Sequence, residues 1–314
     1  MSKKIIAVIG ATGAQGGGLV RSIAADPNGD LVARAITRKI DSDKAKALAA
    51  LGVEVVAADT DDAASIERAF AGAYGAYCVT NYWEHYSVDR EGAQAATMAR
   101  ASRRSGVQHV IWSTLEDTRH LIPSDDPRMP SVHGYKVPHF DSKGQVDKIF
   151  ANEGAPTSYL LGGFYWENLI HFGMGPRANA DGSLTFALPL GGQKLPGVGA
   201  EDIGRCAHGI FKLGASAAGR RFGISGDILS GEEMAARLGK ALGKTVGFYD
   251  MPFDAYRALG FPGADDLGNM FQYQQLCGEA FLNARDVKLS RELNPLLQSF
   301  DAWLADNSAR IAVS

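Results

Sequence analysis

The sequence is poor in cysteine and has no excess of basic residues, and both shortages exclude classes of protein. Its three cysteines, Cys78, Cys206 and Cys277, stand far apart and form no CxxC or CxxH pair. We therefore expect neither a disulfide framework nor a zinc site, and the count is typical of a reducing compartment. The net charge is −3. Because non-specific nucleic-acid binding depends on a basic face, we expect no direct contact with nucleic acid.

Long apolar runs are also missing, since no stretch is long enough to span a bilayer. Residues 1–4 lead straight into the first expected strand and leave no room for a signal peptide. We therefore expect a cytoplasmic protein without membrane contact, also nuclear if the source is eukaryotic. With 314 residues, 46% of them hydrophobic, the chain can bury a large core and divide into two lobes.

The most informative stretch is a glycine motif close to the start of the chain. Residues 5–9 are an apolar run rich in β-branched residues, a GxxGxxG motif follows, and residues 19–24 are typical of a helix. Between a strand and a helix, this motif predicts a dinucleotide pyrophosphate site at the helix N-terminus. The alternative is a turn that serves only helix-on-sheet packing. The candidate contacts are Gly10, Thr12, Gly13, Ala14, Gln15 and Gly16.

The end of the second expected strand predicts which dinucleotide binds. Residues 31–36 form this strand, which ends at Thr37, Arg38 and Lys39 without a carboxylate. An acidic residue at this point accepts from a ribose 2′-hydroxyl, whereas an arginine accommodates a 2′-phosphate. Arg38 and Lys39 therefore favour NADP(H) over NAD(H). The alternative is a solvated basic turn.

The next two strands supply further candidates for the cofactor site. Residues 53–58 form a strand that ends at Asp59 and Thr60, near the expected adenine; Asp61 or Asp62 could equally cap the helix that follows. Residues 75–80 form a central strand, and ligands of open α/β sheets bind at its carboxyl end. We expect Thr80, Asn81 and Tyr82 to line the ribose and nicotinamide side. Tyr82 and Trp83 could instead be lid packing.

The fifth strand and the segment after it carry the candidate catalytic residues. The strand at residues 107–112 ends at Ser113 and Thr114, and residues 116–134 form a proline-containing surface excursion. One helix is expected from Pro138 to the glycine at 154. In it His139 and Lys143 are one turn apart and should project together.

The remaining pattern predicts an α/β fold: a Rossmann doubly wound parallel sheet with a smaller interleaved α+β C-terminal domain. A sixth strand at residues 157–161 is followed by an aromatic segment in which we place the further cofactor contacts Phe164 and Asn168. We expect residues 1–161 with 193–225 to form the NADP(H)-binding domain. Residues 162–192 with 226–314 would form the smaller substrate- or partner-binding domain.

The motifs in this order resemble the NmrA-like family, atypical members of the short-chain dehydrogenase/reductase superfamily. The resemblance rests on GATGAQGG, Thr37-Arg38, VTNYW at 79–83, HFDSKG at 139–144 and FYWEN at 164–168. The stretch LGFPGA at 259–264 is similar to the NADPH-sensor branch in particular. The resemblance implies NADP(H) binding in a cleft between two domains. It also implies contact with partner proteins that changes with redox state, and a homodimer.

Active members of the superfamily use Tyr-x-x-x-Lys and an upstream serine or threonine. Lys143 matches the lysine and Ser113 or Thr114 the hydroxyl, but His139 stands at the tyrosine position. A neutral imidazole is a poor acid for a developing alkoxide, so the standard ketone-reductase mechanism is not expected. Lys143 could instead bind the ribose hydroxyls, and His139 could be a packing residue.

Two functions from different classes therefore remain at this point. The first is an NADP(H)-binding, redox-responsive regulator that acts through protein partners. The alternative is an NADPH-dependent oxidoreductase that uses Lys143 and reduces a small carbonyl, enone or quinone held by the aromatic segment Phe164, Tyr165 and Trp166.

Overall fold

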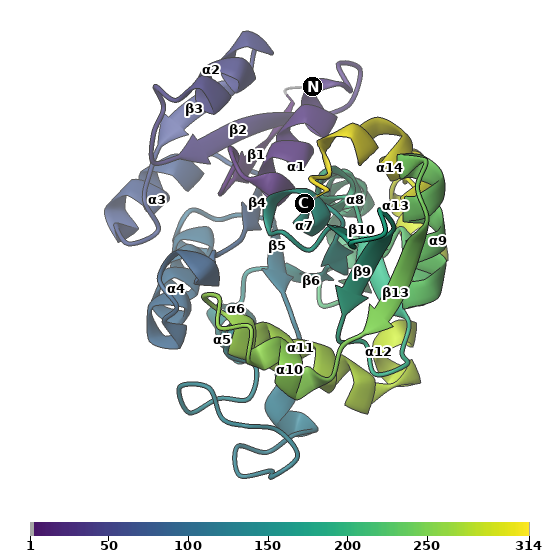
Figure 1. Ribbon diagram of the computed structural model, residues 1–314. Coiled ribbons are helices and arrows are strands. Elements are labelled where there is room, and N and C mark those ends of the chain that lie inside the picture. The colour runs from purple at the N-terminus through teal and green to yellow at the C-terminus, as the bar shows by residue number, and fades with distance from the viewer. Residues whose placement is uncertain (1–2, 314) are drawn as a thin grey trace.

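A seven-stranded, wholly parallel sheet forms the centre of the computed structural model, which describes residues 3–313 (Figure 1). The strand order is β11-β6-β5-β4-β1-β2-β3, the doubly wound arrangement that the sequence predicts. The last strand of this sheet along the chain is β11, which pairs with β6. The strands are β1 (Lys4–Val8), β2 (Leu31–Thr37), β3 (Glu54–Ala57), β4 (Gly75–Cys78), β5 (His109–Thr114), β6 (Thr157–Leu161) and β11 (Arg221–Gly223).

Helices cover both faces of this sheet, so its strands are apolar on both sides. In β1, Ile6 and Val8 enter the hydrophobic core on one face, while Ala7 enters the core on the other. Cys78 in β4 is fully buried and packs as a small core residue. The first face carries α1 (Ala14–Ala24), α2 (Asp43–Ala50) and α8 (Ala200–Leu213); the second carries α3 (Ala63–Phe70), α4 (Val88–Arg104) and α6 (Asp147–Glu153).

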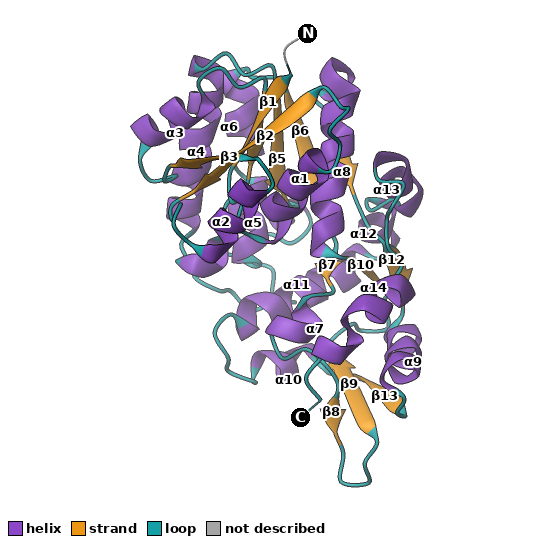
Figure 2. Ribbon diagram, turned by 90° about the horizontal axis from the view of Figure 1, so that it is seen from above, coloured by secondary structure: helices purple, strands orange, loops and turns teal. Residues whose placement is uncertain are grey.

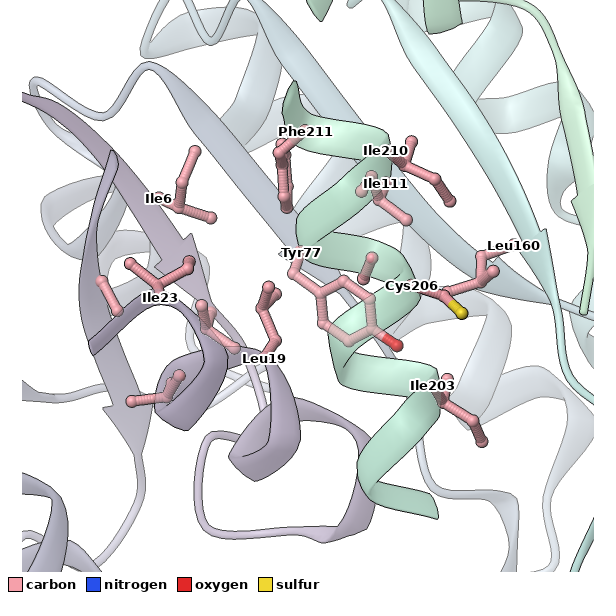
Figure 3. Packing of buried hydrophobic residues seen from close by; sticks show 14 of the residues in the cluster. Ile6, Leu19, Ile23, Tyr77, Ile111, Leu160, Ile203, Cys206, Ile210 and Phe211 are labelled. Carbon is pink, nitrogen blue, oxygen red and sulfur yellow. The ribbon is translucent and has the colours of Figure 1, made fainter. Parts of the chain in front are cut away.

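Helices α1 and α8 cross at very short range over the sheet. A Cβ atom on Gly204 would lie 2.1 Å from the backbone nitrogen of Leu19, and one on Gly18 would lie 2.6 Å from the carbonyl oxygen of Glu201. The two backbones can approach this closely only without side chains at these positions. Figure 3 shows the apolar contacts around the crossing, including Ile203 of α8. This packing sets the direction of α1.

The smaller lobe is built from two three-stranded sheets and the C-terminal helices (Figure 2). Its core contains Trp166, Phe300 and Trp303, all fully buried. One sheet consists of β7 (Phe164–Tyr165), β10 (Leu195–Val198) and β12 (Asp227–Leu229), and the other of β8 (Arg177–Ala178), β9 (Leu184–Leu188) and β13 (Val246–Asp250). The helices after the main sheet are α7 (Asn168–His171), α9 (Gly231–Leu242), α10 (Phe253–Arg257), α11 (Ala264–Cys277), α12 (Glu279–Asn283), α13 (Val287–Leu293) and α14 (Phe300–Asn307).

The chain passes between the lobes more than once. Helix α8 returns to the main sheet and packs on α1, whereas β10, just before it, pairs in the smaller lobe. Helix α13 packs against α8, and its Leu293 joins the core of the main sheet. Short 3₁₀ segments complete the structure: η1 (Tyr82–Glu84), η2 (Thr118–His120), η3 (Gly214–Ala217) and η4 (Ser308–Arg310). Within residues 3–313 no helix is long and apolar enough to cross a membrane.

The single helix expected from Pro138 to residue 154 is wrong, because the chain forms α5 (Pro138–Gly144) and then the separate helix α6. A Cβ at Gly144 would lie 2.3 Å from the backbone nitrogen of Asp117, so the end of α5 is pressed against another segment. Asp147, the first residue of α6, is held by the side chain of Trp112, whose Nε1 donates to its Oδ1 at 3.0 Å. These tertiary contacts break the helix where the sequence pattern is continuous.

Candidate functional site

The glycine motif forms a tight turn that presents the N-terminus of α1 at the carboxyl edge of the sheet. Gly10 has φ +64°, a conformation that favours glycine, and its carbonyl accepts from the N–H of Gly13 at 2.8 Å. A Cβ on Gly16 would lie 2.5 Å from the Gly10 oxygen. The first turn of α1 carries no acidic residue, and no side chain caps it. The free backbone N–H groups there suit an anion.

A hollow of about 270 Å³ lies at the end of β2, beside this turn. Its lining combines three cationic side chains with three hydroxyl groups and contains no carboxylate. Three of the six lining residues were not expected from the sequence, namely Thr37, Ser42 and Lys44. The full set is Thr12, Thr37, Arg38, Lys39, Ser42 and Lys44. Such a set can bind a phosphate group through charge-assisted hydrogen bonds.

The tertiary structure brings a carboxylate to Arg38 that the local sequence lacks. Arg38 Nη1 donates to Glu84 Oε1, which belongs to the segment after β4. This hydrogen bond holds the pKa of the Arg38 guanidinium above its usual value. The end of β2 itself has no carboxylate, as its sequence shows, and the acidic neighbour of Arg38 comes from a distant segment.

The end of β3 is organised mainly by its own backbone. Asp59 accepts from the N–H of Asp61 at 3.0 Å through Oδ1, and Thr60 is half-buried. Asp62, one of the two candidates for the cap, accepts from the N–H groups of the first turn of α3. Asp61 instead pairs with Arg90 at 2.6 Å. Asp59 and Thr60 thus lie at the carboxyl edge of the sheet, beside the hollow. None of their contacts identifies them as an adenine-binding pair.

Lys143 reaches from α5 to the end of β4. Its Nζ donates to Thr80 Oγ1 at 2.7 Å, to the Thr80 carbonyl oxygen at 3.1 Å and to Glu91 Oε1 at 2.8 Å. An ammonium has three donors, so this ammonium is fully satisfied within the protein. Burial alone would raise the pKa of Glu91, but Lys143 and the hydroxyls of Ser142 and Thr80 outweigh it and hold that pKa below its usual value.

His139 has a different set of partners from Lys143. Its Nδ1 lies 2.6 Å from Asp266 Oδ1, and its backbone N–H donates to Asp266 Oδ2 at 3.1 Å. Asp266 belongs to α11, so this pair joins α5 to the smaller lobe. The ring also packs against Trp83 at 4.7 Å between centroids. The two residues share a helix face, but their functional groups are not bonded to each other.

The two candidate hydroxyls at the end of β5 point to opposite faces of the sheet. Ser113 Oγ donates to Gln15 Oε1 at 2.8 Å, whereas Thr114 Oγ1 donates to Asp147 Oδ1 at 2.6 Å on the α6 side. Gln15 also bonds the phenols of Tyr77 and Tyr165. Burial raises the pKa of Tyr165 to about 12. These bonds hold the Gln15 side chain at the end of β5, with its amide oxygen shared by Ser113 and Tyr77.

The aromatic residues of the segment after β4 pack closely on one another and on α5. Tyr82 is buried, and its ring lies 5.4 Å from that of Trp83 and 6.3 Å from that of His139. Asn81 is exposed, and its carbonyl accepts from the N–H of Glu84. In the smaller lobe, Phe164 is buried against Phe271, and Asn168 begins α7.

Three charged residues of the site were not found by sequence reasoning: Glu84, Glu91 and Asp266. Each lies in or beside the first turn of a helix, where the neighbouring sequence is typical of an acidic residue on the surface. Only their distant partners, Arg38, Lys143 and His139, distinguish them, and no local pattern reports such pairings. Among residues 3–313 no group of three His, Cys, Asp or Glu side chains could hold a metal ion.

Comparison with known proteins shows which family this chain matches. Residues 2–304 match the model of the NmrA-like family. An NmrA-like family domain-containing oxidoreductase, FrzB of Cladobotryum sp, is 28% identical over 87% of this chain and 84% of its own length. The crystal structure of NmrA, a negative transcriptional regulator in complex with NADP, is 20% identical, with a TM-score of 0.77 over 98% of this chain and 96% of that chain.

An NADPH-dependent quinone oxidoreductase from Escherichia coli has the same fold, at 22% identity and a TM-score of 0.68 over 97% of this chain and 98% of that chain. At these identities the solved structures establish the fold alone. Regulators and oxidoreductases thus share this architecture. The match over nearly the whole chain establishes that this protein belongs to the NmrA-like family.

Proposed function

We propose that this chain binds NADP(H) across the carboxyl edge of its main sheet and acts as a cofactor-responsive regulator. The observation that carries the proposal is the hollow at the end of β2, where Arg38, Lys39 and Lys44 stand with three hydroxyls. A 2′-phosphate on the adenosine ribose needs such a cationic site, and a 2′-hydroxyl does not. The NADP(H) complexes among the structural neighbours support the same assignment.

The turn of the glycine motif supports the pyrophosphate end of this proposal. Its backbone would bind the diphosphate through the N–H groups of Ala14, Gln15 and Gly16 in the first turn of α1. A Cβ at Gly16 would collide with the turn itself, so the glycine keeps the turn compact. Thr12, whose hydroxyl lies 3.5 Å from that of Thr37, would contact the adenosine side.

The remaining cofactor contacts are proposed from their position at the same edge. Asp59 and Thr60 would meet the adenine. The nicotinamide half would lie toward the segment after β4 and the smaller lobe. Its proposed contacts are Thr80, Asn81, Tyr82, Phe164 and Asn168, with Lys143 holding Thr80 in place. Bound NADPH supplies a hydride, so the side chains around it decide whether any chemistry follows.

The arrangement of Lys143 and His139 favours a structural role over proton transfer. All three donors of Lys143 are used by Thr80 and Glu91. His139 is held by Asp266 of the smaller lobe. These residues therefore hold the lobes and the end of β4 in place. A regulator of this kind must have two conformations that bind the cofactor with different free energies. A protein partner, or a second copy in a homodimer, would bind one of these conformations more tightly than the other.

The proposal is tested by calorimetric titration of the whole protein with NADP⁺, NADPH and NAD⁺. Replacement of Arg38 by alanine should weaken NADP⁺ and NADPH binding by about 10- to 100-fold, because a hydrogen bond to a charged group is worth about 1.5–3 kcal/mol. NAD⁺ binding should stay within about twofold. The control is Arg103→Ala, at an exposed arginine near the far end of α4. An unchanged preference in Arg38→Ala would refute the assignment of the 2′-phosphate site.

The second candidate function is an NADPH-dependent reductase of quinones or enones. It is favoured by the hydroxyl network of Ser113, Tyr77 and Tyr165 around Gln15 at the end of β5, and by the oxidoreductases among the relatives. The test is NADPH consumption, followed by its absorbance, over a panel of quinones and enones. Turnover that disappears in a folded Lys143 variant would make the protein an enzyme rather than a regulator alone.

A further inference from the structure

The cationic hollow already contains one anionic neighbour from elsewhere in the chain. Arg38 Nη1 donates to Glu84 Oε1, and the two side chains are 56% and 43% exposed. Solvent and ligands can therefore reach both partners. The carboxylate of Glu84 is bonded to the guanidinium that a 2′-phosphate would need.

Among residues 3–313, Glu84 is the only acid that hydrogen-bonds to Arg38. Asp59 and Asp61 act on Arg38 through space, but Asp61 is engaged by Arg90 at 2.6 Å and by Gln94 at 3.0 Å. A phosphate that approaches Arg38 therefore has one direct competitor, and it lies in the β4–α4 loop, residues 79–87.

This loop is also in contact with the smaller lobe. Trp83, next to Glu84, packs against His139 with 4.7 Å between the ring centroids. It also lies so close to Gly263 that a Cβ atom on that glycine would be 2.7 Å from the Trp83 ring. His139 is bonded in turn to Asp266 of α11. The loop thus spans from the end of β2 to the lobe proposed to contact partners.

We propose that Glu84 is an internal competitor for the cofactor's 2′-phosphate, and that its displacement from Arg38 releases the β4–α4 loop. A phosphate carries more charge than a carboxylate and offers three acceptor oxygens to a guanidinium, so it wins Arg38. A dinucleotide with a 2′-hydroxyl leaves the Arg38–Glu84 pair intact. The position of the loop, and its contact with the smaller lobe, then depends on the 2′-phosphate and not on the rest of the dinucleotide. The inference rests on the proposed NADP(H) site.

The first test uses 2′,5′-ADP and 5′-AMP, which differ only in the 2′-phosphate. An exposed ion pair is worth up to about fivefold in an equilibrium constant. Glu84→Gln should therefore tighten 2′,5′-ADP binding by about fivefold and leave 5′-AMP binding within about twofold. The control is Asp89→Asn, at an exposed acid in the first turn of α4, which should change neither. Unchanged or weaker 2′,5′-ADP binding in Glu84→Gln would overturn the proposal.

The two hypotheses fail in different ways in this experiment. If the wild-type protein binds both nucleotides equally, the 2′-phosphate site itself is wrong. If the wild type prefers 2′,5′-ADP but Glu84→Gln does not increase the preference, the site stands and the competition by Glu84 is wrong.

The release of the loop has its own readout in amide hydrogen exchange. The N–H groups of Glu84, His85 and Tyr86 donate to the carbonyls of Asn81 and Tyr82. In the wild type, 2′,5′-ADP should speed their exchange and 5′-AMP should not. In Glu84→Gln they should exchange fast without any ligand. Slower or unchanged exchange in the wild type with 2′,5′-ADP would contradict release.

Discussion

Replacement of Lys143 by methionine should destabilise the whole fold as well as alter the candidate site. Lys143 is 13% exposed, and its partner Glu91 is completely buried. Methionine keeps much of the apolar stem but leaves the carboxylate buried without its cation. Removing one partner of a buried pair costs about 3–5 kcal/mol. With an unfolding entropy of about 2.1 cal/mol/K per residue, this corresponds to a fall in Tm of about 5–8 °C.

The assay is thermal unfolding followed by circular dichroism, at about pH 8 and about pH 5. Without Lys143 the desolvated carboxyl of Glu91 should have a raised pKa, so its protonation at the lower pH removes the buried charge. The loss of Tm should therefore be smaller at the lower pH. Adding Glu91→Gln to the Lys143 variant should also recover part of the loss.

The matched control is Lys148→Met, at an exposed lysine of α6, which should shift Tm by less than about 1 °C. A Lys143→Met protein as stable as the wild type at both pH values would refute the view that Lys143 holds Glu91. The result also governs the reductase assay, because lost turnover in an unfolded variant says nothing about catalysis.

Two further predictions concern stability alone. Gly204→Ala should lower the free energy of unfolding by at least about 1–3 kcal/mol, because its Cβ would lie 2.1 Å from the backbone nitrogen of Leu19. Gly92→Ala in α4 should raise it by about 0.4–1 kcal/mol, because the new Cβ meets only Val146, at 3.7 Å. Urea unfolding measures both changes, and equal effects of the two variants would refute the close crossing of α1 and α8. Burial lowers the pKa of His109 to about 4 in the folded protein. As the pH drops, the unfolded chain therefore binds a proton at His109 before the folded protein does. The free energy of unfolding should fall between about pH 6.5 and pH 4, by at most about 3 kcal/mol. His109→Gln should flatten this slope in urea titrations at several pH values, and an unchanged slope would contradict it.

The sequence alone determined the main sheet and the position of the dinucleotide edge. Residues 5–9 and 110–112 are apolar without interruption, because a parallel strand covered by helices is buried on both faces. The glycine at position 10 is needed for a positive φ. These are local demands, and each leaves a mark on neighbouring residues, so the order of the strands and the turn before α1 could be predicted.

The tertiary structure alone decided which groups meet at that edge. Glu84 reaches Arg38 across 46 positions, Glu91 meets Lys143 across 52, and Asp266 meets His139 across 127. It also broke the helix after Lys143, because Gly144 is pressed against the segment after β5. A charge or a close approach that comes from a distant segment leaves no periodic pattern in the local sequence. The partners of the site residues therefore became visible only once the chain was folded.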